Sequence, residues 1–179
     1  MALKRLTIKG YGQLELNQVA FRRDGRIEAQ CKMADGIEYL ENGMLLSVDN
    51  VKREVSKPTG NTGLIALNYS TEHMYDERKS ALKDFKLDKG SFLPRLGYLA
   101  AGDKFTTNCI AYDSSEYNDD SAVIAALGNI GTTPVYGKPC TEGAIQLTAT
   151  KPTGSVVLQV VAKTTMPDGQ LGVKFIALN

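Results

Sequence analysis

The chain has 179 residues, of which 42% are hydrophobic and 23% are charged, a composition typical of globular proteins with room for one core or two small ones. Its apolar runs fall short of the about 18 residues that a membrane helix needs, and its start lacks the apolar run of a signal peptide, so we expect a protein made and kept in a cytoplasm. The net charge of +1 argues against bulk nucleic-acid binding, which depends on a strong basic excess.

The first part of the chain predicts short β-strands, because apolar and polar residues alternate between residues that favour turns. Two dipeptides, Asp24-Gly25 and Asn42-Gly43, each stand between alternating segments and favour tight hairpin turns. The predicted strands are residues 3–8, 13–21, 26–33 and 44–48.

Residues 56–63 are the most linker-like stretch, with one Pro and two Gly among small polar side chains. We place a domain boundary there. It separates a β-rich N-terminal arm or subdomain, residues 1–57, from a second domain that spans residues 64–179.

The second part of the chain predicts two helices and several strands. A seven-residue apolar spacing with Thr71 as a cap favours a helix over 71–85, and a second helix over 121–127 has acids before it and Gly128 after it. The predicted strands are residues 64–69, 104–112, 144–150, 155–163 and 171–177. The strand over 155–163 is nearly all apolar, so we expect it to be central with both faces covered, and Met166–Gln170 to turn the chain into the last strand.

Together these elements predict a mainly β fold: an antiparallel barrel or sandwich with one or two short helices and a β-rich N-terminal extension. The patterns do not determine the order of the strands.

No set of residues indicates catalysis, which needs a nucleophile, a base and a group that orients them. The only histidine is His73, and no Ser or Cys motif accompanies it, so we interpret it as a surface or packing residue. The glycine-bearing loops over 60–63 and 128–131 lack the spacing of phosphate-binding motifs. We therefore predict a protein that is not an enzyme and has no cofactor and no small-molecule substrate.

The three cysteines, Cys31, Cys109 and Cys140, are far apart and form no CxxC pair. Free thiols in or near the core are the favoured interpretation, and a Cys3His zinc site with His73 is the alternative.

A dense carboxylate cluster precedes the second predicted helix. Its members are Asp113, Glu116, Asp119 and Asp120. Their spacing does not match an EF-hand loop, so a solvated acidic loop is favoured. A weak cation site, a contact with a neighbouring subunit and a glycosidase pair are the alternatives.

Several stretches together resemble one kind of protein. They are Ser91–Leu99, Ala101–Asn108, Lys163–Gln170 and Glu41–Leu45. They resemble small structural proteins encoded among the head genes of tailed phages, in particular capsid decoration (cement) proteins. The resemblance extends over most of residues 40–179 and has no fixed motif.

The resemblance implies a virion protein that is assembled in the host cytoplasm and binds the outer surface of the capsid across subunit boundaries. Its partner would be the major capsid protein, with self-association left open, and it would need no nucleic acid or membrane. Binding to the expanded shell in preference to its precursor would stabilise the expanded shell.

Exposure and composition suggest two groups of capsid contacts: the basic N-terminal arm and one apolar loop. The residues are Lys4, Arg5, Lys9, Phe92, Leu93, Pro94 and Arg95. Leu3–Ile8 either adds a strand to a capsid sheet or is the first strand of the protein's own sheet.

Other functions fit the same sequence. One is another virion component, such as a tail-tube, head-completion or fibre-base protein. Another is a β-sandwich that binds carbohydrate or a host surface, which the eight tyrosines favour and the absence of tryptophan disfavours.

Overall fold

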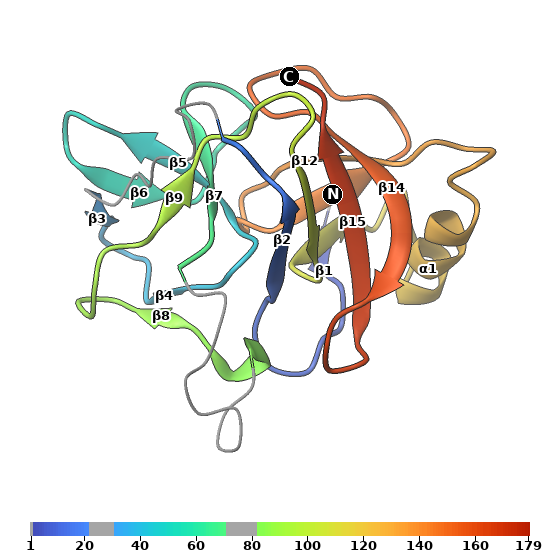
Figure 1. The fold of residues 1–179 in the computed structure, drawn as a ribbon, viewed down its shortest axis with the longest axis horizontal. Helices are drawn as coiled ribbons and strands as arrows, with labels where there is room; N and C mark the ends of the chain where they lie inside the picture. The colour runs from blue at the N-terminus through green and yellow to red at the C-terminus, as the bar shows by residue number, and fades with distance from the viewer. Residues whose placement is uncertain (1, 22–30, 71–81) are drawn as a thin grey trace.

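The computed structural model describes residues 2–21, 31–70 and 82–179. These residues form 15 strands in three sheets, one α-helix and one short 3-10 turn (Figure 1). The prediction of a mainly β fold is confirmed, and one of the sheets curves into a half-barrel.

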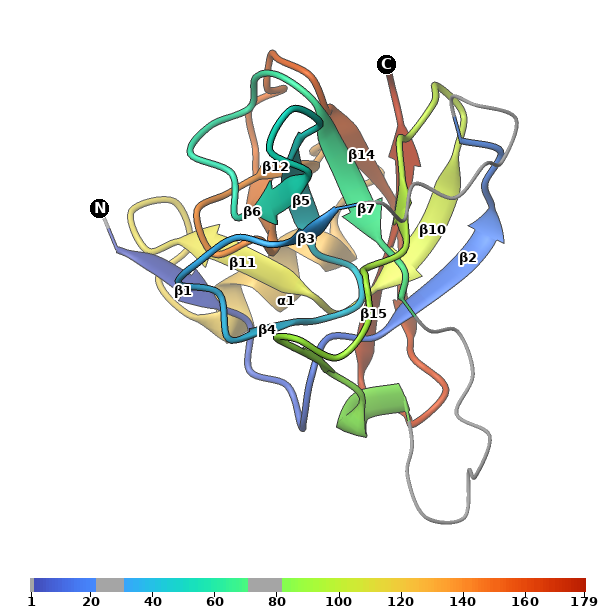
Figure 2. The ribbon, with the colours of Figure 1, turned by 90° about the vertical axis from the view of Figure 1, so that its left-hand side faces the viewer.

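The largest sheet has eight strands that come from both ends of the chain. In spatial order they are β1 (Leu3–Arg5), β11 (Ile110–Asp113), β13 (Ile145–Thr148), β12 (Tyr136–Pro139), β14 (Leu158–Thr165), β15 (Leu171–Ala177), β10 (Lys104–Thr107) and β2 (Leu14–Gln18). All neighbours are antiparallel except β11 and β13, which run parallel. Figure 2 shows the edge strands β1 and β2 on opposite sides of the molecule.

Five short strands make the second sheet, which is the half-barrel, and two more make a separate ribbon. The five are β3 (Lys32–Met33), β6 (Glu54–Ser56), β5 (Leu45–Asp49), β7 (Ile65–Asn68) and β9 (Leu96–Gly97). The ribbon pairs β4 (Tyr39–Leu40) with β8 (Leu87–Asp88), and the 3-10 turn η1 (Leu82–Asp84) precedes it.

Two hydrophobic clusters hold the sheets together. In the larger one, Phe105 and Phe175 are fully buried with their ring centroids 5.7 Å apart, and Leu45 and Leu67 of the five-stranded sheet join them. The smaller cluster packs the other face of the five-stranded sheet against β11 and the ends of β12 and β13. Each large side chain buried in this way contributes about 1.5–3 kcal/mol to folding.

The helix predicted over 121–127 is α1 (Asp120–Gly128), which packs beside β14 (Figure 1). Asp119 is its N-cap and accepts a hydrogen bond of 2.8 Å from the amide of Ala122. The helix predicted over 71–85 lies mostly outside the described residues, and its last part forms η1 rather than an α-helix.

The Asn42-Gly43 turn is present, but the predicted hairpin around it is wrong. Gly43 has φ +84°, while β4 pairs with β8 and β5 pairs with β6 and β7. The amide of Gly43 donates to Asn68 and that of Leu45 donates to Gly143, so distant segments take the backbone groups that a hairpin would use. The hairpin predicted at Asp24-Gly25 lies outside the described residues.

Two strand predictions need correction. Residues 104–112 form two strands rather than one, because the chain turns at Asn108 and the Cys109 amide donates to the Thr107 hydroxyl. The last long strands form the predicted hairpin, but β14 is covered on both faces only in part: Leu158 and Val160 are buried, whereas Val161 is 41% exposed.

Segments on both sides of residues 58–63 share the two larger sheets. Strand β1 pairs with β11, β2 pairs with β10, and β5 pairs with β7. The division into residues 1–57 and 64–179 stays a prediction, and the paired strands show that the two parts are interleaved. Among the described residues, no helix is long and apolar enough to cross a membrane.

Candidate interaction surface

The N-terminal strand belongs to the protein's own sheet, since Leu3–Arg5 pairs with β11. Lys4 is exposed on this edge strand, and Lys9 is exposed in the loop that follows. The backbone of Lys9 is held by Gln170, whose side-chain oxygen accepts from its amide and whose side-chain nitrogen donates to its carbonyl at 3.1 Å. Both lysine side chains therefore remain accessible to a partner.

Arg5, which was predicted as a capsid contact, instead points into the molecule, where its guanidinium binds a buried carboxylate. It donates to both carboxylate oxygens of Glu41 at 3.1 and 2.8 Å, and the amide of Gly12 donates to the same carboxylate at 2.6 Å. Glu41 is only 4% exposed. This paired carboxylate ties β1 to the turn between β4 and β5, and sequence analysis did not identify it.

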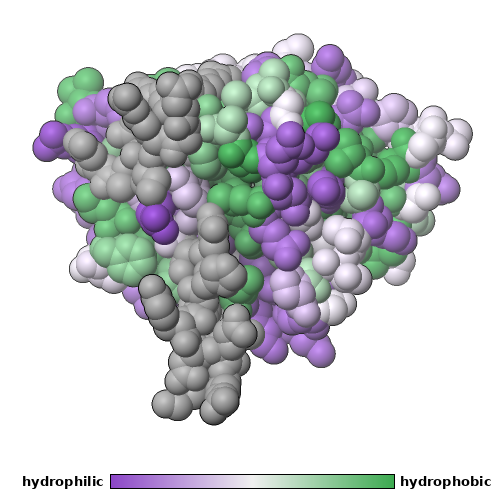
Figure 3. Space-filling view, viewed as in Figure 1, coloured by the Kyte–Doolittle hydropathy of each residue, from purple (hydrophilic) through white to green (hydrophobic). Residues whose placement is uncertain are grey.

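The predicted loop carries two exposed apolar side chains: Phe92 is 54% exposed and Leu93 is 44% exposed. Tyr39, on the β4–β8 ribbon from which the loop departs, is 39% exposed. We call Tyr39, Phe92 and Leu93 the ribbon surface. Figure 3 shows hydrophobic residues on the side of the molecule where this ribbon and loop lie.

The loop is fixed at both ends. The Lys89 ammonium binds Asp35 at 3.0 Å, and the Lys89 amide donates to the Glu38 carbonyl. At the far end, Arg95 lies 5.9 Å from the ring centroid of Tyr69, and its amide donates to the hydroxyl of Ser70. The apolar side chains are thus presented on an anchored loop.

The remaining two predicted contacts in this loop differ in exposure. Arg95 is exposed, as a contact residue must be, but Pro94 is buried and faces the protein itself. The N-terminal residues and the loop are on different sheets, β1 at the edge of the eight-stranded sheet and the loop before β9.

A basic side chain covers two aromatic rings next to the ribbon. The Lys86 ammonium lies 5.7 Å from the ring centroid of Tyr11 and 5.4 Å from that of Tyr39, and the two rings meet edge to face at 5.5 Å. Lys86 also binds Asp88 at 2.8 Å. Tyr39 is therefore packed on one side by the Tyr11 ring and the Lys86 ammonium while it remains partly exposed on the ribbon surface.

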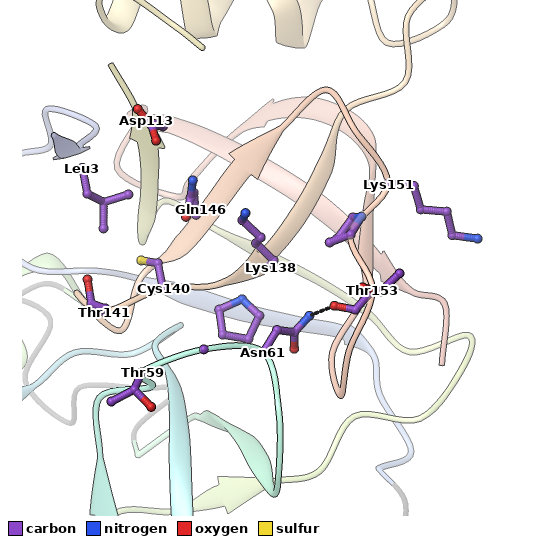
Figure 4. A pocket seen from close by; sticks show the side chains of 13 residues that line it. Leu3, Thr59, Asn61, Asp113, Lys138, Cys140, Thr141, Gln146, Lys151 and Thr153 are labelled. Atoms are coloured by element: carbon purple, nitrogen blue, oxygen red, sulfur yellow. Dashed lines mark hydrogen bonds between the residues drawn. The ribbon is translucent and has the colours of Figure 1, made fainter. Parts of the chain in front are cut away.

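A polar groove of about 570 Å³ lies elsewhere, against β1, β11, β13 and β12. It is lined by Leu3, Thr59, Gly60, Asn61, Asp113, Lys138, Pro139, Cys140, Thr141, Gln146, Lys151, Pro152 and Thr153. Lys138 and Gln146 lie near its middle, and Lys151 points outward at one end (Figure 4). The sequence analysis did not predict this groove, although Asp113 and Cys140 were considered there as members of alternative metal sites and Leu3 as part of a capsid-binding strand.

The four clustered acids each have a local structural role. Asp119 caps α1, Asp113 accepts from the amide and hydroxyl of Ser115, and Glu116 accepts from the Thr148 hydroxyl and the Ala149 amide. Asp120 accepts from the Thr7 amide at 3.0 Å and the Tyr112 hydroxyl at 2.8 Å. Each carboxylate of the cluster therefore has hydrogen-bond donors within the protein.

The three cysteines are buried, and none of them forms a disulfide bond among the described residues, in agreement with the favoured interpretation of thiols in or near the core. Burial raises the pKa of Cys109 to about 12, although the neighbouring Arg5 acts in the opposite direction. No group of ligands that could hold a metal ion is found among the described residues, and His73 lies outside them.

Comparison with known proteins adds no relative: no family model, no curated protein and no solved structure matches this chain.

Proposed function

We propose that this protein is a structural component of a tailed-phage particle that binds the outer surface of the capsid across subunit boundaries and stabilises the expanded shell. The observation that carries the proposal is the ribbon surface, where Tyr39, Phe92 and Leu93 are exposed on anchored backbone. Aromatic and aliphatic side chains of this kind are typical anchors of protein–protein interfaces.

Two further features support a binding role rather than catalysis. The carboxylates of Glu41 and of the acidic cluster bind backbone amides and neighbouring side chains, so they serve the fold. The exposed cations Lys4 and Lys9 add polar groups that a partner could contact. The loop that carries Lys9 borders the ribbon surface, since Tyr11 meets the Tyr39 ring at 5.5 Å.

A sedimentation experiment tests the proposal. The purified protein is mixed with expanded phage shells from which decoration has been removed, and with unexpanded precursor shells. We expect saturable co-sedimentation with the expanded shells alone, because preference for one form is what stabilises it. Failure of the folded protein to bind either shell contradicts the proposal, and ring or tube formation by the isolated protein would indicate a tail component instead.

A further inference from the structure

The polar groove is formed where the five-stranded sheet stops covering the eight-stranded sheet. The strand register places Lys138 opposite Gln146, and Gln146 opposite Ala111. Side chains two residues apart share a face, so Asp113 lies on the same face as these three. Cys109 and Cys140 on that face are buried under the five-stranded sheet, whereas Lys138 and Gln146 are only partly covered.

One asparagine fixes the loops that wall the groove. The Asn61 side chain donates to the carbonyls of Thr153 and Val156 at 2.9 and 2.8 Å and accepts from the Val156 amide at 2.9 Å. Its backbone carbonyl accepts from the Ser155 amide. The walls are therefore held together before any ligand arrives, which lowers the entropic cost of binding.

The chemistry of the groove favours a ligand rich in hydrogen-bond acceptors. Lys138 forms no ion pair with a described residue. Hydrogen bonds from Ser115, together with the charge of Lys138, lower the pKa of Asp113, and the Asp113 carboxylate keeps two bonds to Ser115. Lys151 adds a second positive charge at the open end. No aromatic residue lines the groove, so a sugar ring would find no stacking surface.

We propose that this groove binds an extended acidic peptide segment of a partner protein, with a ligand carboxylate paired to the Lys138 ammonium. The volume of about 570 Å³ lies within the about 300–1,000 Å³ that is usual for ligand sites. The hydroxyls of Thr59, Thr141 and Thr153 lie along the groove and are suited to the polar main chain of a peptide. The groove is separate from the ribbon surface, and the inference does not depend on capsid binding.

Fluorescence anisotropy with a labelled peptide of alternating Glu and Ser tests this inference. We expect the peptide in which Gln replaces Glu to bind about tenfold more weakly, and Lys138→Gln to weaken binding of the Glu peptide by about the same factor, because each removes a charge-assisted hydrogen bond. Lys138→Arg keeps the charge and is expected to keep the affinity within about twofold.

Lys52→Gln is the matched control, since Lys52 is an exposed lysine in the turn between β5 and β6, outside the groove. It is expected to bind the Glu peptide as the unmodified protein does. Equal losses in Lys52→Gln and Lys138→Gln would overturn the inference by showing unspecific charge attraction. The inference also fails if the Glu peptide does not bind, or if inorganic phosphate displaces it as well as an unlabelled copy does.

Discussion

At the scale of single residues, the ion pair of Arg5 and Glu41 is the contact whose effect on the free energy of unfolding is easiest to predict. Glu41 is almost fully buried, and a buried carboxylate that loses its partner is strongly destabilising. Because the Arg5 side chain remains 29% exposed, water would screen part of that loss.

We predict that Arg5→Met lowers the free energy of unfolding by about 2 kcal/mol, below the about 3–5 kcal/mol of a fully buried pair. Urea denaturation of the variant and of the unmodified protein measures this change in the free energy of unfolding. Lys4→Met, on the same strand but exposed, is the control and should change stability by less than about 0.5 kcal/mol. Equal effects of the two substitutions would show that the Glu41 contact is not important for folding.

The lowered pKa of Asp120 gives an expectation of how the stability of the protein depends on pH. Burial raises the pKa of Asp120, but hydrogen bonds from Thr7 and Tyr112 outweigh it and hold the pKa below its ordinary value. A carboxyl whose pKa is lowered in the folded state stabilises the protein above its unfolded pKa of about 3.9, and this contribution is lost as the pH falls through the folded pKa.

Asp120→Asn should therefore be less stable than the unmodified protein at pH 7, and the difference should shrink as the pH falls below about 4. Urea denaturation across this range checks it. Tyr112→Phe removes one of the donors to Asp120 and should show part of the same effect. A stability difference for Asp120→Asn that stays constant with pH would contradict this account.

At the scale of elements, the loop that walls the groove depends on Gly154. Its φ is +129°, and a Cβ there would lie 2.1 Å from the carbonyl oxygen of Asn61. Gly169, in the turn between β14 and β15, also has positive φ (+83°), but a Cβ there would meet nothing within 4 Å. Substituting alanine at Gly154 and at Gly169 therefore distinguishes the cost of a steric collision from the cost of backbone strain alone.

We predict that Gly169→Ala lowers the free energy of unfolding by about 1 kcal/mol, and that Gly154→Ala lowers it by about 3 kcal/mol, because the collision adds to the strain. Thermal and urea unfolding of both variants measure the difference. Equal destabilisation would mean that the loop of Gly154 can move away from Asn61 at little cost, so that the steric collision adds nothing to the backbone strain.

Local signals explain which elements the sequence predicts. Asp119 marks the start of α1 because an N-cap acts within one helical turn, while Gly128 is the last helical residue and Asn129 is the C-cap. Pro167-Asp168-Gly169 marks the last hairpin because a turn needs only neighbouring residues. The Asn42-Gly43 turn was predicted for the same reason, but its strand partners were not, because residues such as Asn68 and Gly143 that take its backbone groups are distant in sequence.

The same limit applies to the sites. Exposure of Phe92, Leu93 and Arg95 was expected from an apolar, basic loop, and the structure agrees. The burial of Pro94 and the inward direction of Arg5 depend on segments that pack over them, such as the turn that carries Glu41. The groove has no motif, because the strand register and the Asn61 contacts bring Lys138 together with residues 59–61 and 151–153.

At the scale of the whole molecule, both ends of the chain enter one eight-stranded sheet, and the five-stranded sheet packs against it. The ribbon surface and the edge strand β1 therefore belong to one interleaved framework. Contact groups on one framework keep a fixed spacing, which favours simultaneous binding to neighbouring subunits of a regular shell.

The most direct test of the proposed capsid binding is a saturation experiment with expanded shells and the double variant Phe92→Ser, Leu93→Ser. We predict that the variant binds at least about tenfold more weakly, because the anchors of an interface supply most of its affinity. Val51→Ser is the control, since Val51 is apolar and 95% exposed in another turn, and it should bind as the unmodified protein does. Unchanged affinity of the folded double variant would contradict the assignment of the ribbon surface as the capsid contact.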